Sequence, residues 1–239
     1  MVEILDVICE NLKFSTYGLC LEERPYIPVA EQEVIFHEGI DKRDGSLTEY
    51  GSLKDRTFSL TVNLLGDSPA KSILRKFRGE LLALRNFKMR LSDELDIYYL
   101  VKSVTMGDIN NEIAEYGSFG LSFVIDPFDY KWDVKRAQGV KNLTVQNEGS
   151  YMALPVITLT GTGEVVLKTN GECPITISHL NGSVVIDGEK LDYYNPANPS
   201  LHTIKVYARN FPELPPGSNT IIATGNVTSL KVEFKERYR

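Results

Sequence analysis

Apolar and polar residues alternate along Phe58–Asn63 (FSLTVN), the period of a β-strand with one buried face. A shorter apolar run, Val34–Phe36, lies earlier in the chain, and a polar stretch containing Asp44-Gly45 separates the two runs. Gly accepts positive φ because it has no Cβ, so Asp-Gly marks a tight turn. The polar stretch is too long for a minimal hairpin turn, and the pattern predicts a long hairpin arm over Ile35–Phe58.

The residues after this strand change to a helical period. Ser68 is a suitable N-cap, and Pro69 suits the first helical position, where its missing N–H is not needed. Four apolar residues then share one helical face: Ile73, Leu74, Phe77 and Leu81. The sequence therefore predicts a helix within Pro69–Leu84 that packs on a sheet.

The other faces of this predicted helix are basic, with Lys71, Arg75, Lys76 and Arg78. A basic amphipathic helix is compatible with binding to nucleic acid or to a membrane surface. A solvated helix packed on a sheet is the commoner case, and it is the one we expect here.

Strand patterns return after the helix, at Lys88–Leu91, Tyr98–Val101 and Gly120–Ile125. Pro127 and Asp129 are expected to end the last of these strands. We therefore predict a mainly β domain with one packed helix over residues 1–135, followed by a junction over residues 136–149.

Short strand-like runs separated by turn signals fill residues 150–239, with no helical period. The expected turns are Gly161-Thr162-Gly163, Asn170-Gly171, Asn181-Gly182 and Asp187-Gly188. The expected strands between and after them include Val156–Thr160, Glu164–Thr169, Ile175–Ile177, Val184–Asp187, Thr220–Ala223 and Leu230–Phe234. This spacing predicts an antiparallel β-sandwich.

The charge is divided unevenly between the two halves. The 239-residue chain has a net charge of −6; residues 1–135 hold 16 Lys/Arg and 23 Asp/Glu, a net charge of −7, and the remainder is +1. An acidic first half repels phosphate, so we expect no specific nucleic-acid binding. No run reaches the roughly 18 apolar residues of a membrane helix, and no signal peptide is recognisable, so we expect no membrane insertion.

A catalytic or metal-binding pattern is not recognisable. Cys9, Cys20 and Cys173 are too scattered for a disulfide framework or a zinc site. The histidines and the carboxylate-rich turns lack the spacing of a nucleophile with its base or of a calcium loop. We expect no enzyme activity, no cofactor and no metal. A tyrosine surface for sugars, formed by Tyr193, Tyr194, Asn195 and Tyr207, remains open, although tyrosines in loops and cores are commoner.

Four stretches together resemble the distal tail proteins (the Dit family) of long-tailed phages that infect Gram-positive bacteria. They are Arg43-Asp44-Gly45-Ser46-Leu47 with Tyr50, then Asp96-Ile97-Tyr98-Tyr99 through Val104, then Phe123–Phe128 ending in Asp126-Pro127-Phe128, and finally Asn181–Asp187. Lys42 stands where the family often has Gly. The resemblance covers nearly the whole chain through the order and spacing of the four stretches.

This resemblance implies a tail-tube-like, ring-forming first domain and a galectin-like β-sandwich as the second. It implies a homo-hexameric ring at the virion tail tip, made in the host cytoplasm, that joins the tail tube protein to the tail-associated hub protein and the receptor-binding protein around a channel for DNA. The residues expected between subunits are Arg43, Asp44, Gly45, Leu47 and Tyr50. The alternatives are a carbohydrate-binding module of a cell-surface protein and a major tail tube protein.

Overall fold

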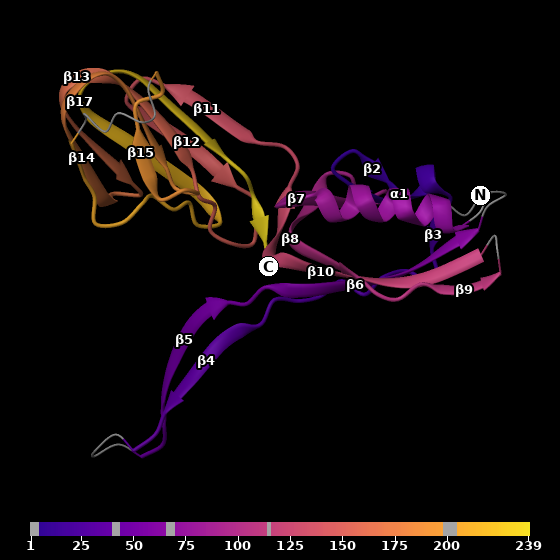
Figure 1. Cartoon of the computed structure of the whole chain (residues 1–239). Coiled ribbons are helices and arrows are strands. Elements are labelled where there is room, and N and C mark those ends of the chain that lie inside the picture. The colour runs from indigo at the N-terminus through magenta and orange to yellow at the C-terminus, as the bar shows by residue number, and fades with distance from the viewer. Residues whose placement is uncertain (1–4, 40–43, 66–69, 114–115, 198–204) are drawn as a thin grey trace. The chain divides into compact units, whose positions relative to one another are not determined.

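The computed structural model describes residues 5–39, 44–65, 70–113, 116–197 and 205–239. The chain divides into two units, one of Met1–Tyr130 with Arg239 and one of Lys131–Tyr238 (Figure 1). Both are mainly β, which confirms the predicted fold class. No helix in the described ranges is long and apolar enough to cross a membrane.

The first unit is built on an antiparallel sheet with the strand order β2-β1-β7-β8-β10-β6-β3, and β9 also pairs with β10. The strands are β1 (Val7–Cys9), β2 (Leu12–Lys13), β3 (Leu19–Leu21), β6 (Arg56–Leu65), β7 (Phe87–Leu91), β8 (Ile97–Met106), β9 (Asn110–Ile113) and β10 (Tyr116–Lys131). A 3-10 turn, Phe14–Tyr17, connects β2 to β3. Strand β6 contains the alternating pattern found in the sequence, and its register pairs Phe58 with Phe123 of β10.

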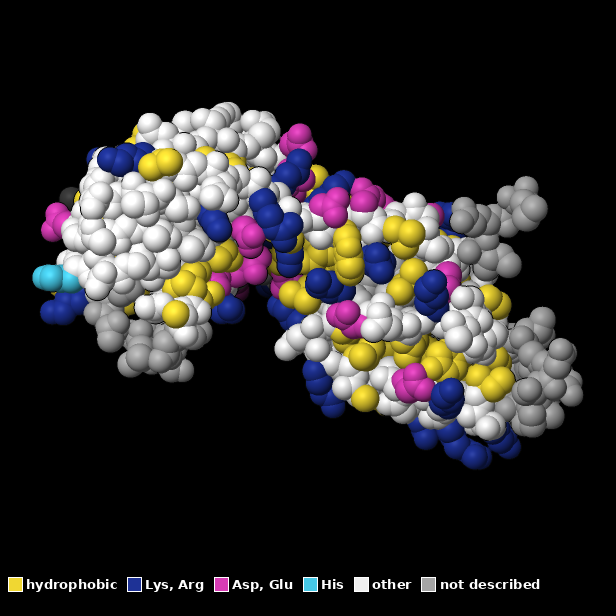
Figure 2. All heavy atoms as spheres, turned by 90° about the horizontal axis from the view of Figure 1, so that it is seen from above, with side chains coloured by type: hydrophobic (Ala, Val, Ile, Leu, Met, Phe, Trp, Pro, Cys, Tyr) yellow, Lys and Arg dark blue, Asp and Glu magenta, His cyan; other side chains and the backbone are white. Residues whose placement is uncertain are grey.

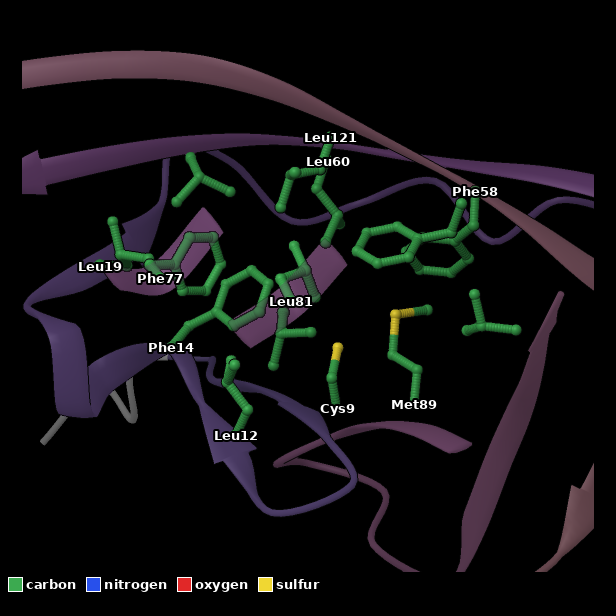
Figure 3. Close-up of a cluster of buried hydrophobic side chains, with 14 of the residues drawn as sticks. Cys9, Leu12, Phe14, Leu19, Phe58, Leu60, Phe77, Leu81, Met89 and Leu121 are labelled. Atoms are coloured by element: carbon green, nitrogen blue, oxygen red, sulfur yellow. The ribbon is translucent and has the colours of Figure 1, made fainter. Parts of the chain in front are cut away.

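The predicted helix is present as α1 (Ala70–Ala83) and packs on one face of this sheet. Leu74, Phe77 and Leu81 are buried, as the helical period predicts, and the ring of Phe77 meets that of Phe14 edge-on with centroids 5.0 Å apart. Figure 3 shows Phe77 and Leu81 converging with Phe14 and with side chains of the sheet. Burying such side chains stabilises the unit by roughly 1.5–3 kcal/mol each. The expected N-cap, Ser68, and Pro69 lie outside the described residues.

The arm is a separate two-stranded sheet of β4 (Gln32–His37) and β5 (Leu47–Leu53). The sequence predicted an arm over Ile35–Phe58 with the run from Phe58 as its second strand, and this pairing is wrong, because β4 pairs with β5. The chain returns along β5, then enters the main sheet as β6, because the alternating apolar side chains of β6 are buried in the core whereas β5 has no buried face.

The second unit is one seven-stranded antiparallel sheet, ordered β11-β17-β13-β14-β15, with β12 on β17 and β16 on β14. The seven strands of this sheet are β11 (Lys135–Gly139), β12 (Asn142–Asn147), β13 (Val156–Thr169), β14 (Glu172–Asp187), β15 (Asp192–Tyr194), β16 (Lys205–Tyr207) and β17 (Gly217–Phe234). A short last strand, β18 (Arg237–Tyr238), follows β17 and is not part of this sheet. The two halves of β13, β14 and β17 enclose a second apolar core that includes Ile157, Leu167 and Ile177. The expected sandwich is therefore present.

Several expected turns of the sandwich are bends within long strands instead. Asn170-Gly171 does join β13 to β14, but Gly161–Gly163 lies inside β13 and Asn181-Gly182 inside β14. The ladders shift register at Gly163/Val165, and Gly225 of β17 has φ +106°. Glycines and bulges let each of three long strands bend and then continue. The six short strands expected from the sequence are therefore the two halves of β13, β14 and β17.

The expected junction over residues 136–149 is also wrong, because this segment contains β11 and β12, which pair with β17 along both of its halves. The division lies at Tyr130/Lys131 instead. Pro127 does not end its strand: β10 continues to Lys131, and Pro127 lies beyond the last β6 pairing, Ile125–Arg56. The missing N–H of Pro127 therefore removes no hydrogen bond between β10 and β6.

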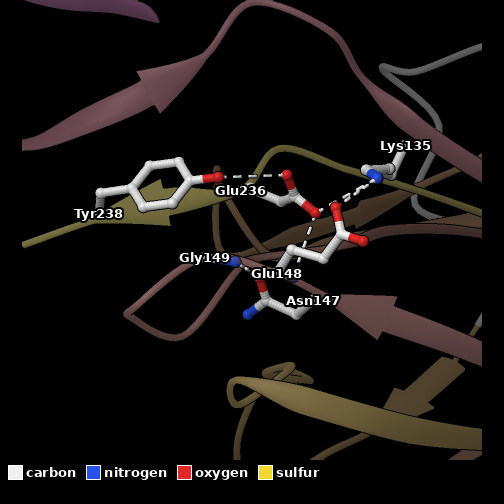
Figure 4. A network of polar contacts seen from close by, with 6 residues as sticks. All are labelled: Lys135, Asn147, Glu148, Gly149, Glu236 and Tyr238. Atoms are coloured by element: carbon white, nitrogen blue, oxygen red, sulfur yellow. Dashed lines mark hydrogen bonds and ion pairs between the residues drawn. The ribbon is translucent and has the colours of Figure 1, made fainter.

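A buried carboxylate, Glu236, ties together the start and the end of the second unit (Figure 4). It accepts a 3.1 Å hydrogen bond from the Glu148 N–H, and the Lys135 ammonium lies 3.6 Å away. The neighbouring Asn147 donates from Nδ2 to the carbonyl groups of Tyr151 and Leu214. These contacts make the segment after residue 130 an integral part of this unit.

Candidate functional site

The arm exposes apolar side chains along its whole length. Val34, Ile35, Phe36, Leu47 and Tyr50 are all exposed, Phe36 by 62% and Tyr50 by 69%. In the segment leading to the arm, Tyr26 is 86% exposed. A cluster of exposed apolar side chains marks an interaction surface, since covering each of them lowers the free energy.

The strand register divides the arm into two faces. Val34 pairs with Tyr50 and Phe36 with Thr48, which puts these four side chains on one side, here called the uncharged face. Ile35 pairs with Glu49 and His37 with Leu47 on the opposite side. Glu33, which lies against Gly51, shares that side, here called the acidic face.

The acidic face has an ordered cross-strand contact. His37 Nε2 lies 2.6 Å from Glu49 Oε2, and both side chains are about half exposed. Diagonal pairs of this kind connect the strands of a hairpin that has no covering layer. Both outer edges of the arm also remain without a neighbouring strand among the described residues, so their main-chain groups can pair with another chain.

The five residues predicted from the sequence are spread along the arm. Arg43 lies outside the described residues. Asp44 and Gly45 are at the tip, where Gly45 has φ +78°, as the Asp-Gly turn predicts. Leu47 and Tyr50 lie on β5 but on opposite faces, so they cannot contact one partner surface through the same side of the arm.

Arg56 connects the two ends of the arm. Its guanidinium donates from Nη1 to the Pro28 carbonyl, which precedes the arm, at 3.0 Å. It also donates from Nε to the Asp126 carbonyl at 3.1 Å and from Nη2 to Asp129 Oδ1 at 2.7 Å. By donating to these three acceptors, the buried guanidinium holds the base of the arm, here called its root, on β10.

Tyr99, which lies beside Arg56, has a raised pKa. Its guanidinium carbon lies 5.8 Å from the ring centroid of Tyr99. Burial, reinforced by the charge of Asp129, raises the pKa of Tyr99 to about 12. The Tyr99 hydroxyl therefore stays neutral well above the ordinary titration range of tyrosine.

Lys102 forms a second contact at the root, with its ammonium 2.6 Å from Asp55 Oδ1 and 3.0 Å from Asp126 Oδ1. Partial burial lowers the pKa of Lys102, but hydrogen bonds to Asp55 and Asp126 outweigh that effect and raise it overall. Asp55 directly follows the arm, and Asp126 belongs to β10. Lys102, on β8, therefore provides a second connection between the root of the arm and β10.

Sequence analysis missed these root residues, although one signal was available. Arg56 falls in phase with Phe58 and Leu60, so it occupies a core-facing position of the strand, and it is only 6% exposed. A charged side chain at a core-facing position of a strand requires a partner. Its partners lie about 70 residues away in sequence, and only the fold brings them together.

The residues proposed for a tyrosine surface do not gather on one strand pair. Tyr193 and Tyr194 pair with β14 at Val185 and Ile186, whereas Tyr207 pairs with Thr176, on the other side of the Gly182 bend. The Asn195 side chain accepts a hydrogen bond from the Ala197 N–H. Within the described ranges, no group of three or more His, Cys, Asp or Glu is arranged to hold a metal ion.

No protein-family model matches the sequence, and a search of curated proteins finds no match. Among solved structures, the chain is similar to the crystal structure of the SPP1 Dit protein, described as a paradigm of the hub adsorption apparatus in phages that infect Gram-positive bacteria. The TM-score is 0.73 at 16% identity, over 99% of this chain and 100% of that one.

The chain has the Dit fold. This confirms, at the level of the fold, the resemblance found in the sequence. The Dit fold extends over both units, because the match covers nearly the whole chain. A structure of the phage P2 baseplate also matches, over 99% of this chain and 98% of that chain, with a TM-score of 0.42 and 9% identity.

Proposed function

We propose that this protein is a distal tail protein, a structural component of a phage tail tip. In this proposal six copies form a ring that joins the tail tube to the tail-associated hub protein and the receptor-binding proteins, and DNA passes through the ring. The observation that carries the proposal is the exposed apolar arm on a buried, hydrogen-bonded root. The fold shared with SPP1 Dit, described as a paradigm of the hub adsorption apparatus, supports it.

The arm suits head-to-tail assembly because its two faces present different chemistry to two different surfaces. Contacts of this heterologous kind form a ring when the rotation between neighbouring subunits closes. The fixed root limits the conformational entropy lost when the arm is ordered on a partner. Leu47 and Tyr50, on opposite faces, are assigned to separate contacts, and Asp44, Gly45 and Arg43 remain proposed contact residues at or near the tip.

The proposal assigns no catalytic step to the protein. His37 is paired with Glu49 on the arm, and burial raises the pKa of the Cys9 thiol, so Cys9 is a poor thiolate nucleophile. Hydrolysis of cell-wall polysaccharide or peptidoglycan by the purified protein would contradict this part. The proposed location is the virion tail tip, after synthesis in the cytoplasm of the host.

The test is the mass and shape of the purified full-length protein, measured by mass photometry and negative-stain electron microscopy. We expect rings of six copies with a central opening. The double substitution Phe36→Ser with Tyr50→Ser, on the uncharged face, should reduce the ring fraction strongly. Tyr207→Ser is a matched control, because Tyr207 is 61% exposed in the second unit and should leave rings unchanged. A wild-type protein that stays monomeric at all concentrations would refute the proposal.

A further inference from the structure

A groove runs along α1 in the first unit, away from the arm residues described above. One hollow of about 420 Å³ is lined by Arg78, Leu82 and the Val104–Ile109 segment. A second, of about 260 Å³, is lined by Lys71, Leu74, Arg75, Arg78 and Ile109. Arg78 and Ile109 line both, so the two hollows form one groove, here called the α1 groove.

The α1 groove combines apolar walls with an excess of positive charge among the described residues that line it. Leu82, Val104, Met106 and Ile109 are half-buried or exposed. Lys71, Arg75 and Arg78 are exposed, and within the described ranges none of them has an ion-pair or hydrogen-bond partner. Asp108 is the acidic residue among those that line it. Figure 2 looks onto the α1 side of the unit, where hydrophobic side chains are exposed among Lys and Arg.

The acidic face of the arm has the complementary composition. Glu33 and Glu49 lie beside exposed Ile35 and Leu47. Residues 31–53 hold six acidic and two basic residues, a net charge of −4. Helix α1 holds four basic residues and one acidic residue, a net charge of +3. Opposite potentials on matching apolar surfaces favour association and fix its orientation.

The two surfaces also match in length. Strand β4 has six residues, about 20 Å at the rise of an extended strand. Helix α1 has 14 residues, about 21 Å at the helical rise. A hairpin of this size can therefore lie along the helix for its whole length, with apolar side chains on the walls and carboxylates beside the guanidinium groups.

We infer that the α1 groove receives the acidic face of the arm from a second copy of this chain. The inference rests on the proposed ring and specifies its contact: each subunit extends its arm to one neighbour and receives the arm of the other. Glu33 and Glu49 of one copy then lie against Arg75 and Arg78 of the next, with Ile35 and Leu47 against Leu82 and Ile109.

The test uses two charge-reversed proteins. The arm variant has Glu33→Lys and Glu49→Lys, so the face of its arm that carried these carboxylates and its groove are both basic. The groove variant has Arg75→Glu and Arg78→Glu, so its arm and its groove are both acidic. Each variant alone should assemble at least about tenfold more weakly than the wild type, because reversal turns attraction into repulsion. An equimolar mixture should form rings in which the two variants alternate.

The single substitutions Arg78→Glu and Lys76→Glu are a matched pair. Both reverse one charge on α1, but Lys76 lies over the ring of Tyr17 and is not among the residues that line the groove. Only Arg78→Glu should weaken assembly. Circular dichroism verifies that each variant is folded. If either double variant fails to fold, the comparison of Arg78→Glu with Lys76→Glu takes its place.

The outcomes separate this inference from the proposed function. Wild-type rings together with variants that assemble equally well overturn the groove contact and leave the ring proposal intact. Wild-type rings with a mixture that stays monomeric also overturn it. If the arm lay in the groove of its own chain, only a chain with all four substitutions would recover, and the mixture would not. A monomeric wild type overturns both proposals.

Discussion

Arg56 donates a 2.7 Å hydrogen bond from Nη2 to Oδ1 of Asp129, across 73 residues of sequence. The same guanidinium reaches the Pro28 carbonyl, so a single side chain joins the two ends of the arm to the last strand of the first unit. The arm can therefore be exposed on both faces without being independent of the domain that holds it.

Arg56→Ala should destabilise the first unit by about 3 kcal/mol, because it leaves two carbonyl groups and the Asp129 carboxylate without their donor. Arg56→Lys should recover only part of the loss, since one ammonium cannot reproduce the fork. Urea unfolding measures the change in the free energy of unfolding. Proteolytic cleavage in the segment that precedes Gln32 should also become faster. The control is Arg136→Ala, which removes an exposed pair with Glu233 and should cost under about 1 kcal/mol. Equal effects for Arg56→Ala and Arg136→Ala would show that the root contact is unimportant.

Gly225→Ala should destabilise the sandwich by roughly 3 kcal/mol or more, because a Cβ there would lie 2.3 Å from the Glu164 carbonyl oxygen at φ +106°. Gly163→Ala isolates the backbone cost, since Gly163 has φ +80° but no atom within 4 Å of an added Cβ. It should cost roughly 1–2 kcal/mol. Gly225→Ala should therefore lower the thermal unfolding midpoint more than Gly163→Ala does. The reverse order would contradict the structure of this bend.

Tyr99 should make the first unit less stable at alkaline pH. Its pKa is about 12 in the folded protein against an ordinary value of 10.0, so between these values the unfolded state has lost a proton that the folded state retains. Stability is therefore complete below pH 10 and falls as the pH rises through 12. Thermal unfolding of wild type and Tyr99→Phe over this range should show a smaller loss in the variant. Parallel curves would place the phenol in an ordinary environment.

The two units should separate in function if they are cut where the structure divides them. A fragment of residues 1–130 contains the arm, its root and the α1 groove, and should assemble at high concentration. A fragment of residues 131–239 contains its own core and the Glu236 network, and should be monomeric. Light scattering on both fragments decides it. An oligomeric second fragment with a monomeric first would reverse the roles assigned to the two units.

Local sequence patterns identified the elements whose side chains face one core. The helical spacing of Leu74, Phe77 and Leu81 predicted α1, and the alternation from Phe58 predicted β6, because burial of one face imposes the period of the element. The change to short strand-like runs predicted an antiparallel sandwich in the second half. The Asp44-Gly45 turn was predictable for the same local reason, since positive φ favours Gly.

Only the tertiary structure decided where those elements pair and bend. Strand β5 has no buried face, so no burial pattern marks it, and its pairing with β4 depends on the hairpin as a whole. Gly161 and Gly182 have the sequence appearance of turns, but they lie in bends within β13 and β14, where the ladders between neighbouring strands shift register. The contact of Arg56 with Asp129 and the groove beside α1 join distant segments, and the free energy of such contacts exists only once the chain has folded.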